Sequence, residues 1–84
     1  MGRSRRPKPK HLADKLRQIR TQLDLTQQQM AERLKKIPSP PDGAMISRYE
    51  RGEREPSLFA LLAYARLAGV VVDVLIDDKL DLPE

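Results

Sequence analysis

The sequence predicts an all-α fold, a compact bundle of five helices in one domain. Two observations predict it. Apolar residues recur at spacings of three and four, as on one face of a helix, and Thr or Ser residues that can cap a helix stand directly before two of these runs. The length of 84 residues limits the chain to a single modest core.

The first helix is predicted from residue 9 or 10 to residue 23. Leu12, Leu16, Ile19 and Leu23 follow one another at spacings of four, three and four, so they lie on one face. This face should pack against the core.

A shorter second helix is predicted from Gln27 to residue 35 or 36. The Thr26 hydroxyl can accept hydrogen bonds from the first backbone N–H groups, and Gln29 can complete a capping box three residues later. The face expected to be buried consists of Met30, Ala31 and Leu34.

The third helix is predicted within residues 39–52, SPPDGAMISRYERG, and its start has two interpretations. Ser39 can cap a helix whose first position is proline, with the Asp42 carboxylate near the helix N-terminus. Alternatively, PPDG forms a turn and the helix starts near Ala44. Under both interpretations the helix ends at Gly52. The side chains expected to face inward are Ile46 and Tyr49.

The fourth helix is predicted between the cap Ser57 and Gly69, which stops it. The apolar positions that define this helix are Leu58, Leu61, Leu62, Ala65 and Ala68.

The final apolar run, VVVDVLIDD, is ambiguous because valine and isoleucine favour strands, whereas its short length favours a last helical turn. We predict a short helix from Val72 to Asp77. Two roles remain open for the apolar side chains of this run, a dimer interface or closure of the core. These side chains are Val71, Val72, Val74, Leu75 and Ile76.

Charge is distributed unevenly along the chain. Residues 1–72 carry fifteen Lys and Arg against seven Asp and Glu, whereas residues 73–84 carry one against five. Residues 1–10 are expected to form a flexible basic arm, residues 11–78 the helical domain, and residues 79–84 an acidic tail. The cations of the arm are Arg3, Arg5, Arg6, Lys8 and Lys10.

The composition argues against an enzyme, a metal site and a cofactor. The sequence has no cysteine, His11 is the single histidine, and no serine has a histidine base at a recognisable spacing. No apolar run approaches the ~20 residues that cross a bilayer. We therefore expect a soluble, cytoplasmic protein that associates with the nucleoid when it is bound to DNA.

Three segments, LTQQQMAERL, ISRYERGEREPSL and YARLAGVVVDVLI, resemble the Cro and lambda-repressor-like family of helix-turn-helix proteins, also called the xenobiotic-response-element family. The resemblance covers residues 12–76. It implies a five-helix bundle whose third helix lies in the major groove of DNA. It also implies a transcriptional regulator, typically a repressor, that binds paired half-sites as a homodimer.

The resemblance also indicates which residues would contact DNA. Base reading is expected from the exposed face of the third helix, where an Arg can bond guanine O6 and N7 together and an apolar group can touch a thymine methyl. These residues are Arg48, Ser47, Ala44 and Met45. Phosphate contacts are expected from Gln27, Gln28, Arg51, Lys35, Lys36 and Arg54. Glu50 is expected to brace the fold through a nearby Arg.

One departure from the family is an enlarged turn. Eleven residues separate Leu34 from Ile46, roughly five more than is usual in the family, whose turn typically takes ~3–4 residues. This turn could bring Lys35 and Lys36 to the DNA backbone or support the third helix.

The basic arm and the acidic tail each have more than one interpretation. The arm could be a solvated terminus, attract phosphates generally, or enter an A/T-rich minor groove. The tail favours a second function, an antitoxin-like or regulator-binding module that docks a protein partner. The residues of this docking segment would be Leu80, Leu82, Asp77, Asp78, Asp81 and Glu84.

Overall fold

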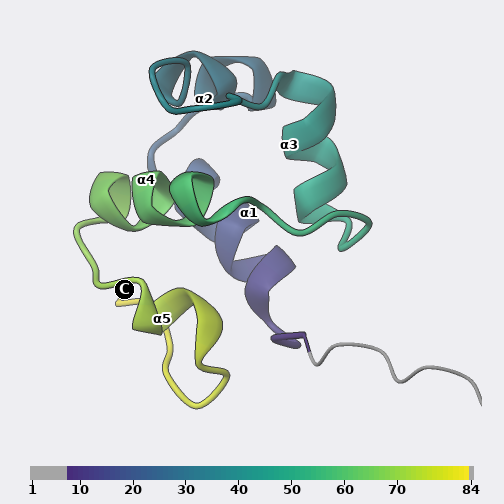
Figure 1. Ribbon diagram of the computed structural model, residues 1–84. Helices are drawn as coiled ribbons and strands as arrows, with labels where there is room; N and C mark the ends of the chain where they lie inside the picture. The colour runs from purple at the N-terminus through teal and green to yellow at the C-terminus, as the bar shows by residue number, and fades with distance from the viewer. Residues whose placement is uncertain (1–7, 84) are drawn as a thin grey trace, which may run out of the picture.

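The computed structural model describes residues 8–83, which form a bundle of five helices with no strand in that range (Figure 1). The helices α2 and α3 lie together at one end, α5 lies at the other, and α1 and α4 connect the two. Their bounds are α1 Leu12–Gln22, α2 Gln27–Arg33, α3 Gly43–Glu50, α4 Leu58–Ala68 and α5 Asp73–Ile76. The predicted all-α fold and the order of its helices are confirmed.

Local capping explains where two of the helices begin. The Thr26 hydroxyl accepts a hydrogen bond from the Gln29 N–H at 3.1 Å, and the Gln29 side chain accepts one from the Thr26 N–H at 2.8 Å. The predicted capping box of α2 is therefore present. At α4 the Ser57 hydroxyl accepts from the Ala60 N–H at 3.1 Å, and Gly69 ends the helix with φ +72°, a left-handed conformation that favours glycine.

The start of α3 follows the turn interpretation, and the interpretation that placed the cap at Ser39 is wrong. Asp42 is the N-cap, and its carboxylate accepts a hydrogen bond from the Met45 N–H at 2.8 Å. Ser39 instead has φ +50°, so it lies in the enlarged turn, three residues before the cap. Pro41, the residue before the cap, is buried.

The core is shared by all five helices. The largest fully buried side chains are Leu16, Ile19, Met30, Leu34, Ile46, Tyr64 and Leu75. In α4 the buried face consists of Ala60, Leu61, Tyr64 and Ala65. Two positions that helped to predict this helix, Leu58 and Leu62, are exposed instead. The sequence did not reveal this because α4 is apolar around its whole circumference, so the pattern does not mark the face that is buried.

The two ends of the domain are joined by a set of contacts that we call the terminal clasp. It consists of Lys15, Asp78 and Leu82 with the backbone N–H groups of Lys10 and His11. The Asp78 carboxylate accepts hydrogen bonds from both N–H groups, at 2.9 and 3.1 Å, directly before the first residue of α1. It thus acts as a cap for a helix that has no side-chain cap of its own at His11. Leu82, expected in a docking segment, is 8% exposed and belongs to the core.

Lys15 is the buried charged residue of the terminal clasp. Its ammonium donates to three backbone carbonyls at the end of α5 and beyond, those of Val74, Asp77 and Leu80, at 2.8, 3.0 and 2.7 Å. A cation at this position also complements the negative end of the helix dipole. Because the side chain is 5% exposed, these bonds are largely shielded from water.

The Asp78→Asn variant is expected to lower the melting temperature at neutral pH by a few degrees. The hydrogen bonds from the backbone N–H groups of Lys10 and His11 hold the pKa of the Asp78 carboxyl below its ordinary value of 3.8. A lowered folded-state pKa contributes stability that is complete above pH 3.8 and is lost as the pH falls through the folded-state pKa. Melting temperatures of wild type and Asp78→Asn, measured from neutral pH down to below pH 3.8, test this role of Asp78. Asp81→Asn, which changes an exposed acid, is the control. If the difference in melting temperature between wild type and Asp78→Asn does not become smaller in acid, the prediction is wrong.

Candidate nucleic-acid interface

The exposed face of α3 presents a short row of side chains. Ala44 and Arg48 are exposed and Ser47 is half-buried, at the spacing of one helical face. The Arg48 guanidinium forms no hydrogen bond or ion pair with any residue from 8 to 83. It is therefore available to a ligand. Met45, predicted with this group, is half-buried and packs against the core, which leaves less of it for a thymine methyl.

Arg51, at the end of α3, is already engaged in the protein. Its Nη1 donates to the Ser47 hydroxyl at 2.7 Å, and its Nε and Nη2 donate to the two Glu53 carboxylate oxygens at 3.0 and 3.1 Å. The pair is exposed, and the hydrogen bond from Arg51 lowers the pKa of the Glu53 carboxyl. Sequence analysis did not single out Glu53, although it lies two residues after Arg51.

A buried network fixes α3 relative to α1 and α2. Arg20 donates from Nε and Nη2 to the Glu50 carboxylate at 2.6 and 2.9 Å, and from Nη1 to the Leu25 carbonyl at 2.9 Å. The Glu50 side chain is 4% exposed, and its hydrogen bonds and charge raise the pKa of the Arg20 guanidinium. The expectation that Glu50 braces the fold through an Arg is confirmed.

The predicted phosphate contacts at the start of α2 lie on this network or beside it. The Gln27 amide donates to Glu50 Oε1 at 3.2 Å, which orients a half-buried side chain at the N-terminus of the helix. Gln28 is exposed, and its side-chain oxygen is 2.8 Å from where a Cβ would stand on Gly43. A Cβ at this position would displace only the end of the Gln28 side chain, because the Gln28 Cα and N would stand at 3.6 and 3.7 Å, ordinary van der Waals distances.

The enlarged turn places its two lysines differently. Lys35 pairs with Glu32 at 3.5 Å on an exposed surface, a weak interaction in water. Lys36 lines a groove against α4, with Ile37 beside it. Ile37 also packs against the core, so the turn is anchored to the body of the domain.

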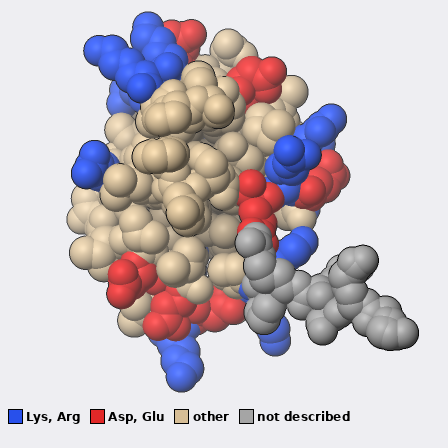
Figure 2. All heavy atoms as spheres, viewed as in Figure 1, with Lys and Arg blue, Asp and Glu red and all other residues tan. Residues whose placement is uncertain are grey.

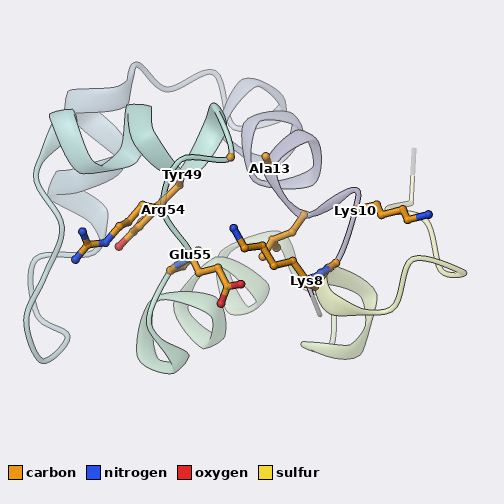
Figure 3. Close-up of a pocket in the computed structure, with 10 residues that line it drawn as sticks. Lys8, Lys10, Ala13, Tyr49, Arg54 and Glu55 are labelled. Carbon is orange, nitrogen blue, oxygen red and sulfur yellow. The ribbon is translucent and has the colours of Figure 1, made fainter. Parts of the chain in front are cut away.

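The base of the arm lies near the end of α3, across a cavity of about 300 Å³. Figure 3 shows Arg54 alongside the Tyr49 ring, Lys8 extending across the space towards α3, and Lys10 pointing away. Burial raises the pKa of the Tyr49 hydroxyl, and the Arg54 charge opposes that shift. The structure thus brings Lys8 and Arg54 to one side of α3. The predicted arm residues Arg3, Arg5 and Arg6 lie outside the described residues.

Two features are absent from residues 8–83. No group of three or more His, Cys, Asp or Glu side chains there is placed to hold a metal ion. No helix there combines the length and the apolar composition that a membrane span requires.

Comparisons with known proteins agree with this fold. The sequence profile of a family described as "Helix-turn-helix domain" matches residues 11–78. The structure is similar to that of the P22 c2 repressor protein, crystallised in complex with the synthetic operator 9T in the presence of Tl+. That similarity has a TM-score of 0.67 at 24% sequence identity and covers 80% of this chain and 94% of that chain. A search of curated proteins gave no match.

Proposed function

Since this chain belongs to the helix-turn-helix domain family, we propose that it binds double-stranded DNA sequence-specifically and represses transcription. One observation carries the proposal: Arg48 lies on the exposed face of α3 without a hydrogen-bond or ion-pair partner among residues 8–83. Beside it are Ala44 and Ser47, whose side chains are small enough to let this helix approach base edges. The structural neighbour, a repressor in complex with its operator, supports the same use of the fold. In this proposal α3 lies in the major groove and Arg48 reads a guanine.

The other predicted contacts would position the helix rather than read bases. Gln27 and Gln28 stand at the N-terminus of α2, where amide side chains can donate to a phosphate oxygen. Arg51 and Arg54 would meet phosphates beyond the end of α3. The arm, through Lys8 and Lys10 at its base, would follow the backbone or the adjacent minor groove.

We further propose that the protein acts as a homodimer on half-sites about one helical turn apart, ~34–36 Å. Exposed apolar side chains in and beside α5 support this proposal. Val71 is 65% exposed, Ile76 46% and Leu80 40%. Leu75 of the same run is fully buried, so the run serves both the core and this exposed surface.

The Arg48→Ala variant tests the proposal directly. Wild type, selected against a randomised duplex pool, is expected to enrich a palindromic motif, and Arg48→Ala is expected to relax one symmetric G·C position by about 1–3 kcal/mol. Lys79→Ala is the matched control, because it removes one exposed cation from the segment after α5, at the opposite end of the domain. If no motif is enriched and binding disappears steeply with salt, the basic surface binds DNA only nonspecifically and the proposal is wrong.

The Glu53→Gln variant is expected to bind DNA about two- to fivefold more tightly. It removes a repelling charge and releases Arg51 from an exposed ion pair, and such pairs are weak enough to be exchanged for a phosphate. Binding should also depend more steeply on salt, because Arg51 then contributes more fully to phosphate neutralisation. Fluorescence anisotropy at several salt concentrations measures both effects. Asp81→Asn, which makes the same charge change on the segment after α5, should change neither; equal effects of the two variants would contradict this role for Arg51.

A further inference from the structure

Helix α4 has two apolar faces, and its own core covers only one of them. The outward side chains follow the spacing of a single helical face and border a groove; they are Phe59, Leu62, Ala63 and Leu67. Phe59 is 55% exposed and Leu62 38%. Figure 2 shows a broad surface without charged side chains on the face of the molecule that includes α4, bordered by both basic and acidic side chains. Contiguous exposed apolar surface of this kind marks a site of interaction.

The enlarged turn builds the opposite wall of this groove. Ile37 and Pro38 line it across from α4, and the space between them has a volume of about 420 Å³. We call this site the α4 groove. The turn therefore extends the helix face into a concave site, a use that neither interpretation of its sequence included.

The rim of the α4 groove is positively charged. Arg33, Lys36 and Arg66 all line it, and none of them forms an ion pair or side-chain hydrogen bond with any residue from 8 to 83. The residues that line the groove include no Asp or Glu. An occupant with apolar side chains and flanking carboxylates would match both the floor and the rim.

Other occupants fit less well. Two copies meeting symmetrically at this face would set the same three cations against one another. The acidic segment after α5 is committed to its own molecule, since Leu82 is in the core and Asp78 caps α1. A DNA backbone would meet the cations but would leave Phe59 and Leu62 without an apolar partner.

We propose that the α4 groove docks an acidic amphipathic helix of a partner protein. Apolar side chains at positions i, i+3 or i+4, and i+7 of that helix fill the space between α4 and the enlarged turn. Its carboxylates meet Arg33, Lys36 and Arg66. None of the α3 residues assigned to base reading lines the groove, and Lys36 is the one predicted phosphate contact that does. The proposal therefore does not depend on base reading by α3.

A displayed library of random peptides about 16 residues long, enough for about four helical turns, provides the probe. The library is sorted for binding to the full wild-type chain and then depleted of binders that the Phe59→Ser variant retains. This second step removes acidic peptides that bind to other basic surfaces of the protein. The remaining peptides are expected to carry Asp or Glu beside apolar residues at helical spacing.

Titration of one selected peptide gives the quantitative test. Phe59→Ser and Arg66→Glu are expected to weaken its binding about tenfold or more. The controls Leu58→Ser, an exposed apolar residue of α4 outside the groove, and Arg17→Glu, an exposed cation of α1, are expected to change it less than about twofold. Circular dichroism confirms that each variant is folded.

Four results would overturn the proposal. The sort could leave no peptide that depends on Phe59, or the selected peptides could lack acidic residues or helical spacing. If wild type is a dimer that Phe59→Ser dissociates, the groove binds a second copy of the chain. If both groove variants lose DNA affinity to the same extent as peptide affinity, the groove binds DNA. Failure of the Arg48 experiment alone would leave the peptide result unchanged, so the two proposals fail separately.

Discussion

The Glu50→Ala variant is expected to lower the free energy of unfolding by about 3–5 kcal/mol. The substitution leaves the Arg20 guanidinium, 15% exposed, with its charge uncompensated inside the domain. It also removes the acceptor of the Gln27 amide, so the start of α2 loses its link to the end of α3. The expected loss is large because folding has already taken both charges out of water.

Chemical denaturation of purified variants measures this effect. Glu53→Ala is the matched control, because it breaks an exposed Arg–Glu pair only three positions away and should cost less than about 1 kcal/mol. Similar losses in the two variants would mean that the Arg20–Glu50 pair contributes no more than a surface pair does. The double variant Arg20→Ala, Glu50→Ala should recover part of the loss, since it leaves no unpaired charge.

The Lys15→Met variant is expected to destabilise the domain by about 3 kcal/mol. Methionine keeps much of the apolar stem but removes three hydrogen bonds from a charged donor, so the carbonyls of Val74, Asp77 and Leu80 lose their shared partner. The end of α5 also loses the cation at its negative pole.

Denaturation curves and amide hydrogen exchange test the role of Lys15 together. The loss of stability should be accompanied by faster exchange in α5, with less change in α2 and α3. Lys79→Met serves as control because it removes an exposed ammonium from the same part of the chain. Uniformly faster exchange across all helices would contradict a specific role at the end of α5.

The sequence predicted the helices well because their signals are local. Thr26, Ser57 and Gly69 each act on backbone groups within three or four residues, so short motifs sufficed to place α2 and α4. The start of α3 was ambiguous because Ser39 and Asp42 are both good caps. The left-handed backbone at Ser39 and burial of Pro41, both results of packing, decide between them.

Long-range contacts were beyond the reach of local signals. Lys15 lies on the apolar face of α1, three residues after Leu12, and this position was the one hint that it is buried. Its carbonyl partners could not be read from the sequence because they lie in and after α5, 59 to 65 positions away. Similarly, the motifs predicted that Glu50 pairs with an Arg, but the identity of Arg20 depends on how α1 crosses α3.

In the candidate site, too, some features could be predicted from the sequence and others depend on the folded structure. The resemblance to the helix-turn-helix family implied that Arg48 lies on the exposed face of α3, whereas the engagement of Arg51 by Glu53 depends on the conformation after Gly52. The α4 groove was not predicted at all. A helix that is apolar around its circumference does not indicate which face it buries, and the opposite wall comes from the enlarged turn.

The terminal clasp also sets an order of events for a chain that folds during synthesis. Its side-chain hydrogen bonds join residues separated by 59 to 68 positions, whereas the Arg20–Glu50 pair spans 30. Contacts that close such long loops form late, after the nearer ones. A nascent chain arrested before Asp78 would therefore contain the α2–α3 pair, while the first turn of α1 still lacked its capping carboxylate. The base of the basic arm, made first, would be the last part of the domain to be fixed in place.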